Sequence, residues 1–480
     1  MTLENPYGRR VIAVDLDGTL VRSDLLVESV FLLLRSRPYL FFRLIGWLLR
    51  GKSFFKRKVA DLVAPAVGTL PYNHSLLEWL VEQKARGAHL VLATASEMRL
   101  ARLVADHLVI FDELLATENK NLASENKRVA LVGRYGEQGF EYVGNSSADL
   151  KVWPSAKVAH VVNPEFGVLS RAKKIARIGE VIEDRPSYFR VLQKSLRLHQ
   201  WAKNLLIFIP LFAAHKAMQI PSLIDGVLAF FCFGVCASSV YLLNDLLDLQ
   251  DDRQHRTKKF RPLAAGTFPI FQAILWMPAL LVISFGVALF MLPLRFSLIL
   301  LTYYVLTLAY SLWLKRIVML DVVMLAMLYT VRVVAGAAAI MVPLTFWILA
   351  FCMFIFLSLA FVKRYTELRD ARERGRKGAA PGRGYVVQDF ELLASLGGSA
   401  GYLSVLVLAL YINDGASQAL YNHPKLMWAA CPLLLFWLSR VWLLAHRGQM
   451  HDDPIVFALR DRTSRCIGVL FALVFILAAL

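Results

Sequence analysis

The chain has 480 residues, 57% of them hydrophobic, and carries a formal net charge of +18. So high an apolar content excludes an ordinary soluble enzyme. The apolar residues are concentrated after about residue 200, so we expect a soluble domain at 1–185 and a membrane domain at 190–480. The positive charge then indicates membrane orientation and phosphate binding, and we expect no nucleic acid as a partner.

Two acids follow the first apolar segment, Val11 to Val14, which has the pattern of a short buried strand. Asp15 and Asp17 are spaced i and i+2 at the end of that strand, so both carboxylates should point into one crevice at the carboxyl edge of a sheet. One can act as a nucleophile and the other as a general acid and base, and both favour Mg²⁺.

The segment Asp15-Leu16-Asp17-Gly18-Thr19 resembles the first motif of the haloacid dehalogenase-like phosphohydrolases. This resemblance implies a Rossmann-like α/β fold and a Mg²⁺-dependent phosphatase site. Later motif positions occur in the family's order. The resemblance implies that Thr94 binds the transferred phosphoryl group, that Lys127 neutralises charge, and that Asn145 and Asp149 complete the metal site.

Position 145 departs from the family pattern, because it is Asn where the family usually has Asp. An amide oxygen still binds Mg²⁺, but one negative charge is lost and metal affinity should fall. Two interpretations stay open: an active phosphatase, or a catalytically inactive domain that serves regulation or assembly.

An insert near 25–67 is rich in Leu, Phe and Trp, with basic residues scattered through it. It occupies the cap position of the superfamily, and its arginines argue against a membrane span. We expect a helical cap that lies against the membrane surface. Packing against the core of the soluble domain is the alternative.

The second half of the chain contains about nine apolar segments near the ~20 residues that cross a bilayer. The loops after the even-numbered segments hold most of the lysines and arginines. By the positive-inside rule we expect a multi-pass protein of a bacterial inner membrane, with the soluble domain and the active sites on the cytoplasmic side. All five cysteines fall in or beside apolar segments, which favours buried packing and a reducing compartment. The expected spans are 202–219, 224–243, 270–290, 294–313, 318–340, 344–362, 395–413, 425–444 and 465–480.

The most informative motif directly follows the second apolar segment. On a helix, Asp245, Asp248 and Asp252 would share one face, where three acids repel each other unless cations lie between them. Basic residues follow at once and suit a polyanion. The arrangement predicts carboxylates that hold Mg²⁺ on a diphosphate, with a solvated loop as the alternative. The candidate residues of the motif are Asn244, Asp245, Asp248, Asp252, Lys258 and Arg261.

This motif resembles the first aspartate-rich motif of the UbiA superfamily of membrane prenyltransferases. Its extended form, through Arg261-Pro262, is similar to the branch of the decaprenyl-phosphate phosphoribosyltransferases. That branch implies an all-α membrane domain, Mg²⁺, phosphoribosyl pyrophosphate (PRPP) as the donor and a polyprenyl phosphate lipid as the acceptor. Asp248 and Asp252 would be the catalytic metal ligands, and Lys203 would help to neutralise the leaving diphosphate.

The second aspartate-rich motif of the superfamily is reduced here to Asp321, with Lys315 before it and Arg332 after it. Fewer acids and more cations suit a donor that carries an extra phosphate. An arginine within a span is costly unless it lines a cavity, so Arg332 is a functional candidate, with a structural bridge to Asp321 as the alternative. The cluster at His451-Asp452-Asp453 is interpreted as a loop held by salt bridges to neighbouring arginines, with metal binding as the alternative.

The resemblances together imply transfer of 5-phosphoribose to the lipid, followed by removal of the ribose 5-phosphate by the soluble domain. Such a product would serve arabinofuranose donor synthesis for cell-envelope glycans. The alternative functions are a prenyltransferase that uses a prenyl diphosphate and an aromatic acceptor, and a fusion with an inactive regulatory domain. Whether the chain forms a homo-oligomer stays open.

Overall fold

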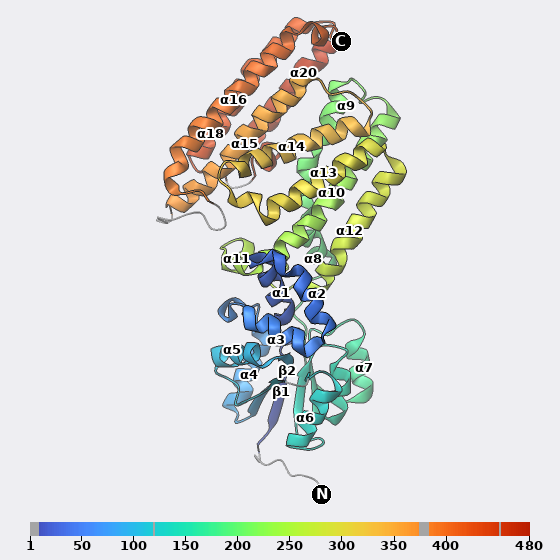
Figure 1. Ribbon diagram of the computed structural model, residues 1–480, viewed down its shortest axis with the longest axis vertical. Helices are drawn as coiled ribbons and strands as arrows, with labels where there is room; N and C mark the ends of the chain where they lie inside the picture. Colours follow the sequence, from blue (N-terminus) through green and yellow to red (C-terminus); the bar gives the residue numbers. More distant parts are fainter. Residues whose placement is uncertain (1–8, 119–120, 374–383, 451–452) are drawn as a thin grey trace. The chain divides into compact units, whose positions relative to one another are not determined.

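The structure is a computed structural model, and it describes residues 9–118, 121–373, 384–450 and 453–480 (Figure 1). Its contacts divide it into two compact units. The first unit comprises Met1–Leu196 and Tyr241–Met277, and the second comprises Arg197–Val240 and Pro278–Leu480. The acid-rich segment around residue 250 therefore packs with the N-terminal residues, although the sequence assigns it to the membrane domain.

The first unit is built on a six-stranded parallel sheet in the order β3-β2-β1-β4-β5-β6. The expected Rossmann-like α/β fold is confirmed. Every residue of β1 is buried, because helices cover both faces of a parallel sheet and its strands must be apolar throughout. The strand order reverses beside β1, which makes its carboxyl end the expected ligand site. The strands are β1 Val11–Val14, β2 His89–Glu97, β3 Glu113–Thr117, β4 Glu141–Gly144, β5 Val158–Val162 and β6 Ile178–Ile182.

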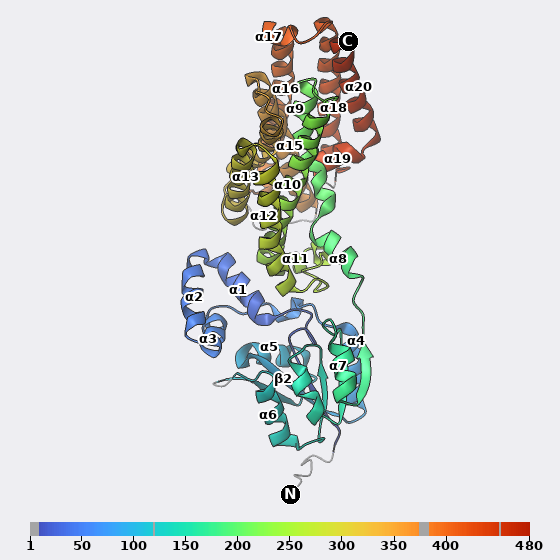
Figure 2. The same ribbon diagram turned by 90° about the vertical axis from the view of Figure 1, so that its right-hand side faces the viewer.

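Two apolar cores lie on the two faces of this sheet. Leu76 and Leu100 belong to the core on one face, and Leu131 and Val168 belong to the core on the other. The helices that supply them surround the strands in Figures 1 and 2. The remaining helices of this unit, apart from the cap, are η2 Val67–Thr69, α4 His74–Ala85, α5 Met98–Leu108, α6 Glu125–Tyr135, η3 Asp149–Lys151, η4 Trp153–Ser155, α7 Val168–Ile175, α8 Tyr188–Ser195, α11 Leu249–Gln254 and η6 Lys258–Phe260.

The insert forms the expected helical cap, whose helices lie together in Figure 2. The Asp24 side chain accepts the backbone N–H of Val27 at 2.9 Å and so caps the first helix. Gly51 has a φ of +112°, a conformation that favours glycine, and it separates the second helix from the third. The cap has a small apolar core of its own. Its elements are α1 Leu25–Ser36, η1 Pro38–Leu40, α2 Phe41–Leu49 and α3 Lys52–Leu62.

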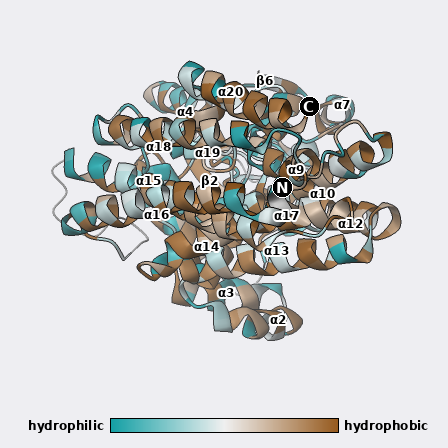
Figure 3. Cartoon of the chain, turned by 90° about the horizontal axis from the view of Figure 1, so that it is seen from above, coloured by the Kyte–Doolittle hydropathy of each residue, from teal (hydrophilic) through white to brown (hydrophobic). Residues whose placement is uncertain are grey.

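The second unit is helical. Among the described residues, eight helices are long and apolar enough to cross a membrane, and apolar residues dominate α13 and α14 in Figure 3. The chain is therefore a multi-pass integral membrane protein, and two of the spans, α10 and α12, each contribute residues to both units. The spans are α10 Ile220–Leu247, α12 Ile270–Met291, α13 Leu294–Leu312, α14 Leu320–Ala339, α15 Phe346–Glu373, Val387–Asn413 (η8 Val387–Asp389 with α16 Phe390–Asn413), Pro424–His446 (η9 Pro424–Ala429 with α18 Ala430–His446) and α20 Arg462–Ala479; shorter elements are η7 Leu314–Arg316, α17 Gly415–Gln418 and α19 Pro454–Arg460.

The first expected span, 202–219, is wrong as a long α-helix. The chain instead forms a 3₁₀ helix, η5 Leu198–Phe208, and a short α-helix, α9 Ile209–Ala213. Pro210 has no backbone N–H and is favoured in the first turn of a helix, which is where α9 has it. Because a 3₁₀ helix rises about 2.0 Å per residue and an α-helix about 1.5 Å, the two together extend roughly 30 Å, close to the hydrocarbon thickness of a bilayer.

The cysteines largely follow the expectation. Cys232, Cys236, Cys352 and Cys431 are buried free thiols, whereas Cys466 is exposed on α20. The first four cysteines are thus packed among apolar side chains, as the sequence predicts.

Candidate functional site

The carboxyl end of β1 gathers the predicted phosphatase residues. Lys127 of α6 donates from Nζ to Asp15 Oδ1 at 2.8 Å and to the Tyr142 hydroxyl at 2.8 Å. The Tyr142 hydroxyl donates in turn to Asp149 Oδ1 at 2.8 Å. Asp15, Lys127 and Asp149 are thus brought together, as their motif positions predict. Tyr142 was missed, because within β4 it has the pattern of an ordinary core residue.

The turn after β4 is fixed by Asp149, whose Oδ2 accepts the backbone N–H groups of Asn145 at 3.0 Å and Ser146 at 2.9 Å. Asn145 Oδ1 accepts the Thr19 hydroxyl at 3.1 Å. Its amide also lies against Gly18, where an added Cβ would come within 2.6 Å of Asn145 Nδ2. The amide that replaces the family's carboxylate therefore faces the loop that follows Asp17.

Asp17 is held by two donors, the backbone N–H of Leu25 at 2.9 Å and the Ser96 hydroxyl at 2.5 Å. Thr94 is buried, and its hydroxyl accepts the backbone N–H of Ser96 at 3.0 Å. Ser96 was missed by the sequence analysis. Its position two residues after Thr94, on the same side of β2, is the signal that could have found it.

The electrostatics of this site favour a cation. Burial raises the pKa of Asp15 to about 6, although Lys127 opposes the shift. Burial also raises the pKa of Asp17 to about 7, with repulsion from Asp24 adding to it. Buried carboxylates beside an amide oxygen are the hard donors that Mg²⁺ prefers. Within the described residues no three Asp, Glu, His or Cys side chains form a metal cluster, so the amide of Asn145 and water would have to complete the shell.

The acid-rich motif lies at the junction between α10 and α11. The helix breaks at Asp248, so the expectation of one continuous helix face is wrong. Asp245 and Asp252 are buried and share Arg261, whose Nη1 lies 3.2 Å from Asp245 Oδ1 and 2.5 Å from Asp252 Oδ2. Asp248 is half-buried and lies 3.6 Å from Nε of Arg35 in the cap.

The same junction has a buried acceptor without a donor. Among the described residues, none donates a hydrogen bond to Asn244 Oδ1. Burial raises the pKa of Asp252, although Arg261 and Lys258 oppose the shift. Lys258 itself is exposed on η6. The orphaned amide oxygen and the buried carboxylates of this segment are oxygen donors of the kind that Mg²⁺ prefers, although no three Asp, Glu, His or Cys side chains of the described residues are grouped there.

In the second unit, Lys203 binds a carboxylate that comes from a distant loop. Asp453 Oδ2 accepts Lys203 Nζ at 2.8 Å and Lys363 Nζ at 3.0 Å, and the Tyr329 hydroxyl donates to it at 3.0 Å. Burial would raise the pKa of Asp453, but the two ammonium groups hold it well below its usual range. The loop is therefore held by salt bridges, as expected, but the partners are lysines of other helices and not neighbouring arginines. His451 and Asp452 lie outside the described residues.

Arg332 is buried within α14. Its Nε donates to Asn204 Oδ1 at 2.9 Å, and its Nη2 donates to the Tyr303 hydroxyl at 3.0 Å. The guanidinium also lies 4.9 Å from the centre of the Tyr303 ring, a cation–π contact. Asn204 follows Lys203 in η5, so Arg332 contacts the same short segment that carries Lys203.

Asp321 is fully buried at the start of α14, where its ion pair is with Arg364 at 2.5 Å. Tyr385 donates its hydroxyl to the same carboxylate at 2.5 Å. This carboxylate therefore ties α14 to α15. Lys315 lies on η7, half-buried, just before that helix.

The chain is similar in sequence to several known proteins. The sequence model of the UbiA prenyltransferase family matches residues 205–461. The uncharacterized protein y4nM of Sinorhizobium fredii is 34% identical over 97% of this chain and 90% of its own length. Nodulation protein NoeC of Azorhizobium caulinodans is 34% identical over 60% of this chain and 94% of its own. Decaprenyl-phosphate phosphoribosyltransferase of Mycobacterium tuberculosis is 29% identical over 58% of this chain and 90% of its own.

Two solved structures are also similar. One is a UbiA homolog from Archaeoglobus fulgidus bound to GPP and Mg²⁺, with a TM-score of 0.45 and 17% identity, covering 60% of this chain and 99% of that chain. The other is a haloacid dehalogenase family hydrolase from Salmonella enterica, with a TM-score of 0.27 and 16% identity, covering 36% of this chain and 69% of that chain.

Proposed function

This chain belongs to the UbiA prenyltransferase family, and we propose that it transfers 5-phosphoribose from PRPP to a polyprenyl phosphate and that a haloacid dehalogenase-like phosphatase domain precedes the transferase domain. The proposal rests on two groups of polar residues, one at the end of α10 and the other at the second motif. Buried carboxylates and an orphaned amide lie at the end of α10, whereas the second motif keeps one acid, Asp321, which Arg364 already neutralises. The similarity to decaprenyl-phosphate phosphoribosyltransferase supports the same substrate class.

At the site of the PRPP donor, Mg²⁺ would be held by Asn244, Asp245, Asp248 and Asp252. The ion would neutralise the charge of the diphosphate as it leaves. Arg261 now compensates two of these carboxylates. When a cation takes that role, the guanidinium becomes available to the diphosphate, together with exposed Lys258. The residues of this motif would therefore both hold the metal ion and stabilise the diphosphate as it leaves.

On the acceptor side, the chemistry needs positioning rather than a base, because a phosphate is already anionic at neutral pH. The C1–O bond of the donor breaks, diphosphate leaves with its electron pair, and a lipid phosphate oxygen attacks C1 from the opposite face. Lys315 and Arg332 are our candidates for binding the ribose 5-phosphate and the lipid phosphate, and we do not assign either residue to one of the two phosphates. Lys203 would help to stabilise the diphosphate.

The first unit would then remove the 5-phosphate from the lipid-linked product. Asp15 attacks the phosphorus as the bond to the ribose oxygen breaks, and Asp17, as the general acid, gives a proton to that departing oxygen. Lys127 and Thr94 would hold the phosphoryl oxygens, and water later releases phosphate from Asp15. Bound Mg²⁺ would be held by Asp15, Asp17, Asn145 and Asp149. The lipid-linked ribose would serve arabinofuranose donor synthesis for envelope glycans.

The basic loops between the spans support a cytoplasmic position of both sites in a bacterial inner membrane. Asn145 favours one competing account, in which the first unit is inactive and regulatory. The family itself favours another, in which a prenyl diphosphate reacts with an aromatic acceptor.

The test is lipid mass spectrometry on the purified full chain with Mg²⁺, PRPP and a polyprenyl phosphate. We expect the lipid to gain ribose, and an intermediate that still carries the 5-phosphate at early times. A lipid that keeps the 5-phosphate throughout would support the regulatory account. An unchanged lipid, with turnover of a prenyl diphosphate and an aromatic acid, would support ordinary prenyl transfer.

A further inference from the structure

The cap helix α2 is apolar on both of its faces. Its inner face packs into the small core of the cap, where Leu44 is buried and Trp47 contacts the same cluster. Its outer face is exposed, with Phe42 80% and Leu49 85% accessible. A surface helix of a soluble domain needs only one apolar face, and a helix that is apolar all round is normally surrounded by protein or lipid.

These side chains form a patch together with Tyr39, which lies just before the helix. Exposed apolar patches of this kind mark interaction surfaces, since leaving them in water forfeits the free energy of burial. The exposed apolar members are Tyr39, Phe41, Phe42, Ile45, Leu48 and Leu49.

Basic side chains surround this patch, and we call them the basic rim: Arg37, Arg43, Arg50, Lys52 and Lys58. Across the described part of the chain, no carboxylate lies within ion-pair distance of any of them. Cations without counterions next to exposed aromatic and aliphatic residues have the composition of an interfacial membrane helix, whose basic residues meet anionic head groups.

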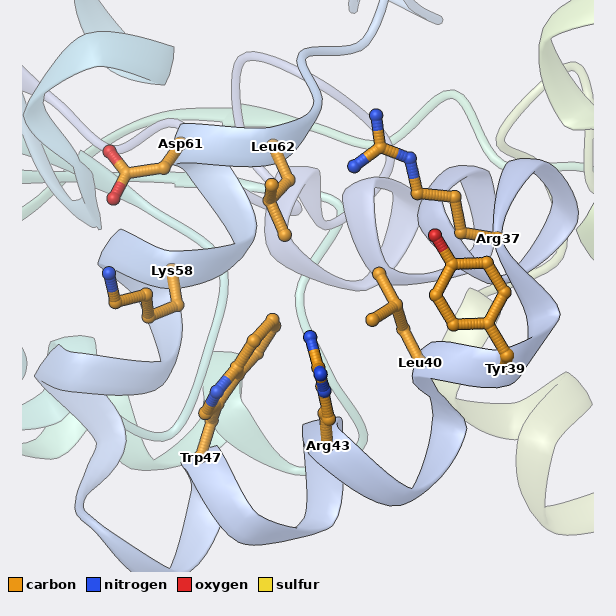
Figure 4. A pocket seen from close by; sticks show the side chains of 8 residues that line it. All are labelled: Arg37, Tyr39, Leu40, Arg43, Trp47, Lys58, Asp61 and Leu62. Atoms are coloured by element: carbon orange, nitrogen blue, oxygen red, sulfur yellow. The ribbon is translucent and has the colours of Figure 1, made fainter.

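A cavity of about 360 Å³ opens beside α2 (Figure 4). Arg43 and Trp47 rise side by side from the helix, with Arg37 and Tyr39 beyond them and Lys58 on the other side. The single acid in its lining, Asp61, is already paired with Arg99 at 2.5 Å. Arginine next to Tyr and Trp suits a phosphate group at a membrane–water boundary.

We propose that α2 lies in the surface of an anionic membrane leaflet, with its outer apolar side chains among the acyl chains and the cavity at Arg37 and Arg43 occupied by the phosphate of a lipid head group. A membrane is the expected occupant because the described residues include eight spans, so the chain is always attached to a bilayer. The net charge of +18 adds attraction to anionic lipid.

The consequence for catalysis rests on the proposed phosphatase function. Lys58 lines the cavity from α3, and Lys56, two residues earlier, points to a different side of the same helix. Lys56 Nζ donates to the Ala95 carbonyl at 2.6 Å, beside Ser96, which binds Asp17. One short helix thus connects the lipid-facing cavity to the phosphatase site, so a lipid-linked phosphate could reach Asp17 without leaving the membrane surface.

The membrane contact is tested without reference to any activity. The full chain, with Cys466→Ser to remove the exposed thiol, carries a spin label on Phe42→Cys or Leu49→Cys and is reconstituted in nanodiscs that contain phosphatidylglycerol. We expect a high accessibility to oxygen and a low accessibility to a water-soluble nickel chelate. The matched control is Phe166→Cys, a fully exposed apolar position in the first unit, where the order should reverse. Nickel accessibility at 42 and 49 equal to that at 166 would overturn the proposal, and so would a short label-to-label distance that shows a second copy covering the helix.

A second experiment tests the catalytic consequence. In the variant Phe42→Glu/Leu49→Glu, the rate on a lipid-linked phosphate should fall about tenfold or more, because two apolar side chains that would lie among the acyl chains are replaced by charged ones. Its rate on ribose 5-phosphate should stay unchanged, which shows that the first unit is folded. Equal loss on both substrates would contradict the proposed route. If the parent chain hydrolyses neither substrate, the phosphatase proposal fails, while the label experiment still decides the membrane contact.

Discussion

Glu28 of the cap and Arg253 of the acid-rich segment form a buried, bidentate ion pair. Arg253 Nη1 and Nη2 lie 2.7 and 2.6 Å from the two carboxylate oxygens of Glu28, although the residues are 225 positions apart in the sequence. Their side chains are only 4% and 2% exposed. Arg253 directly follows Asp252, so the first helix of the cap helps to fix the position of a proposed metal ligand.

Removing one partner of this pair should be costly. Glu28→Gln leaves the guanidinium of Arg253 buried without its counterion, which typically destabilises by about 3–5 kcal/mol. We expect a clear fall in the thermal midpoint of the full chain and a lower rate of lipid phosphoribosylation. The exchange Glu28→Arg/Arg253→Glu should recover part of both.

The matched control is the exposed pair between Arg86 and Glu82. Arg86→Gln should change stability by less than ~1 kcal/mol, as exposed pairs usually do. If Glu28→Gln is as mild as Arg86→Gln, the ion pair does not hold the acid-rich segment in place.

Restoring the family's carboxylate at position 145 should strengthen metal binding in the first unit. Asn145→Asp adds a negative charge to the proposed metal site that includes Asp15 and Asp17. The Mg²⁺ concentration that half-activates the phosphatase should therefore fall several-fold. Asn145→Ala removes the oxygen and should raise it. A Mg²⁺ titration with ribose 5-phosphate measures both, and an unchanged half-activation in Asn145→Asp would show that this side chain is not a ligand.

Arg332 should not tolerate a conservative change. Lysine keeps the positive charge but lacks the planar guanidinium, which donates to Asn204 from Nε and to Tyr303 from Nη2. We expect Arg332→Lys to lower kcat/KM for PRPP by roughly tenfold or more, since each lost bond to a charged group is worth about 1.5–3 kcal/mol. Arg295, exposed at the start of α13, supplies the control Arg295→Lys, which should have wild-type kinetics. Equal kinetics for the two variants would remove Arg332 from the site.

Acid should weaken the first unit through Glu141. Burial would raise the pKa of this carboxyl, but hydrogen bonds from His160 and Arg10 outweigh it and lower the pKa from 4.5 to about 2. A depressed pKa in the folded state stabilises the protein fully above pH 4.5, and that contribution is lost as the pH falls toward about 2. The thermal midpoint of Glu141→Gln should therefore lie below that of the parent at pH 7, and the two should converge at acid pH. Parallel curves down to pH 3 would contradict this assignment.

The sequence predicts what depends on local order. Asp15 and Asp17 follow a strand, and Lys127 and Asp149 follow in motif order, so their meeting at one sheet edge could be expected. The salt bridges Glu28–Arg253 and Lys203–Asp453 could not be, because each joins segments more than two hundred residues apart and no local pattern specifies the partner.

Local patterns also fail where the backbone departs from its regular period. The spacing of the acid-rich motif predicts one helix face, but the break at Asp248 turns that side chain toward Arg35 and leaves Asp245 and Asp252 together on Arg261. In the same way, hydrophobicity alone does not show that the segment before Pro210 winds as a 3₁₀ helix.

The central claim is that two sites act in sequence on one lipid, and a comparison of three full-length proteins tests it most directly. Lipid mass spectrometry with PRPP, Mg²⁺ and a polyprenyl phosphate should find lipid-linked ribose without a 5-phosphate for the parent chain. Asp15→Asn should accumulate the lipid that still carries the 5-phosphate, and Asp252→Asn should leave the lipid unmodified. A dephosphorylated product from Asp15→Asn, or phosphoribosylated lipid from Asp252→Asn at the parent rate, would contradict the account.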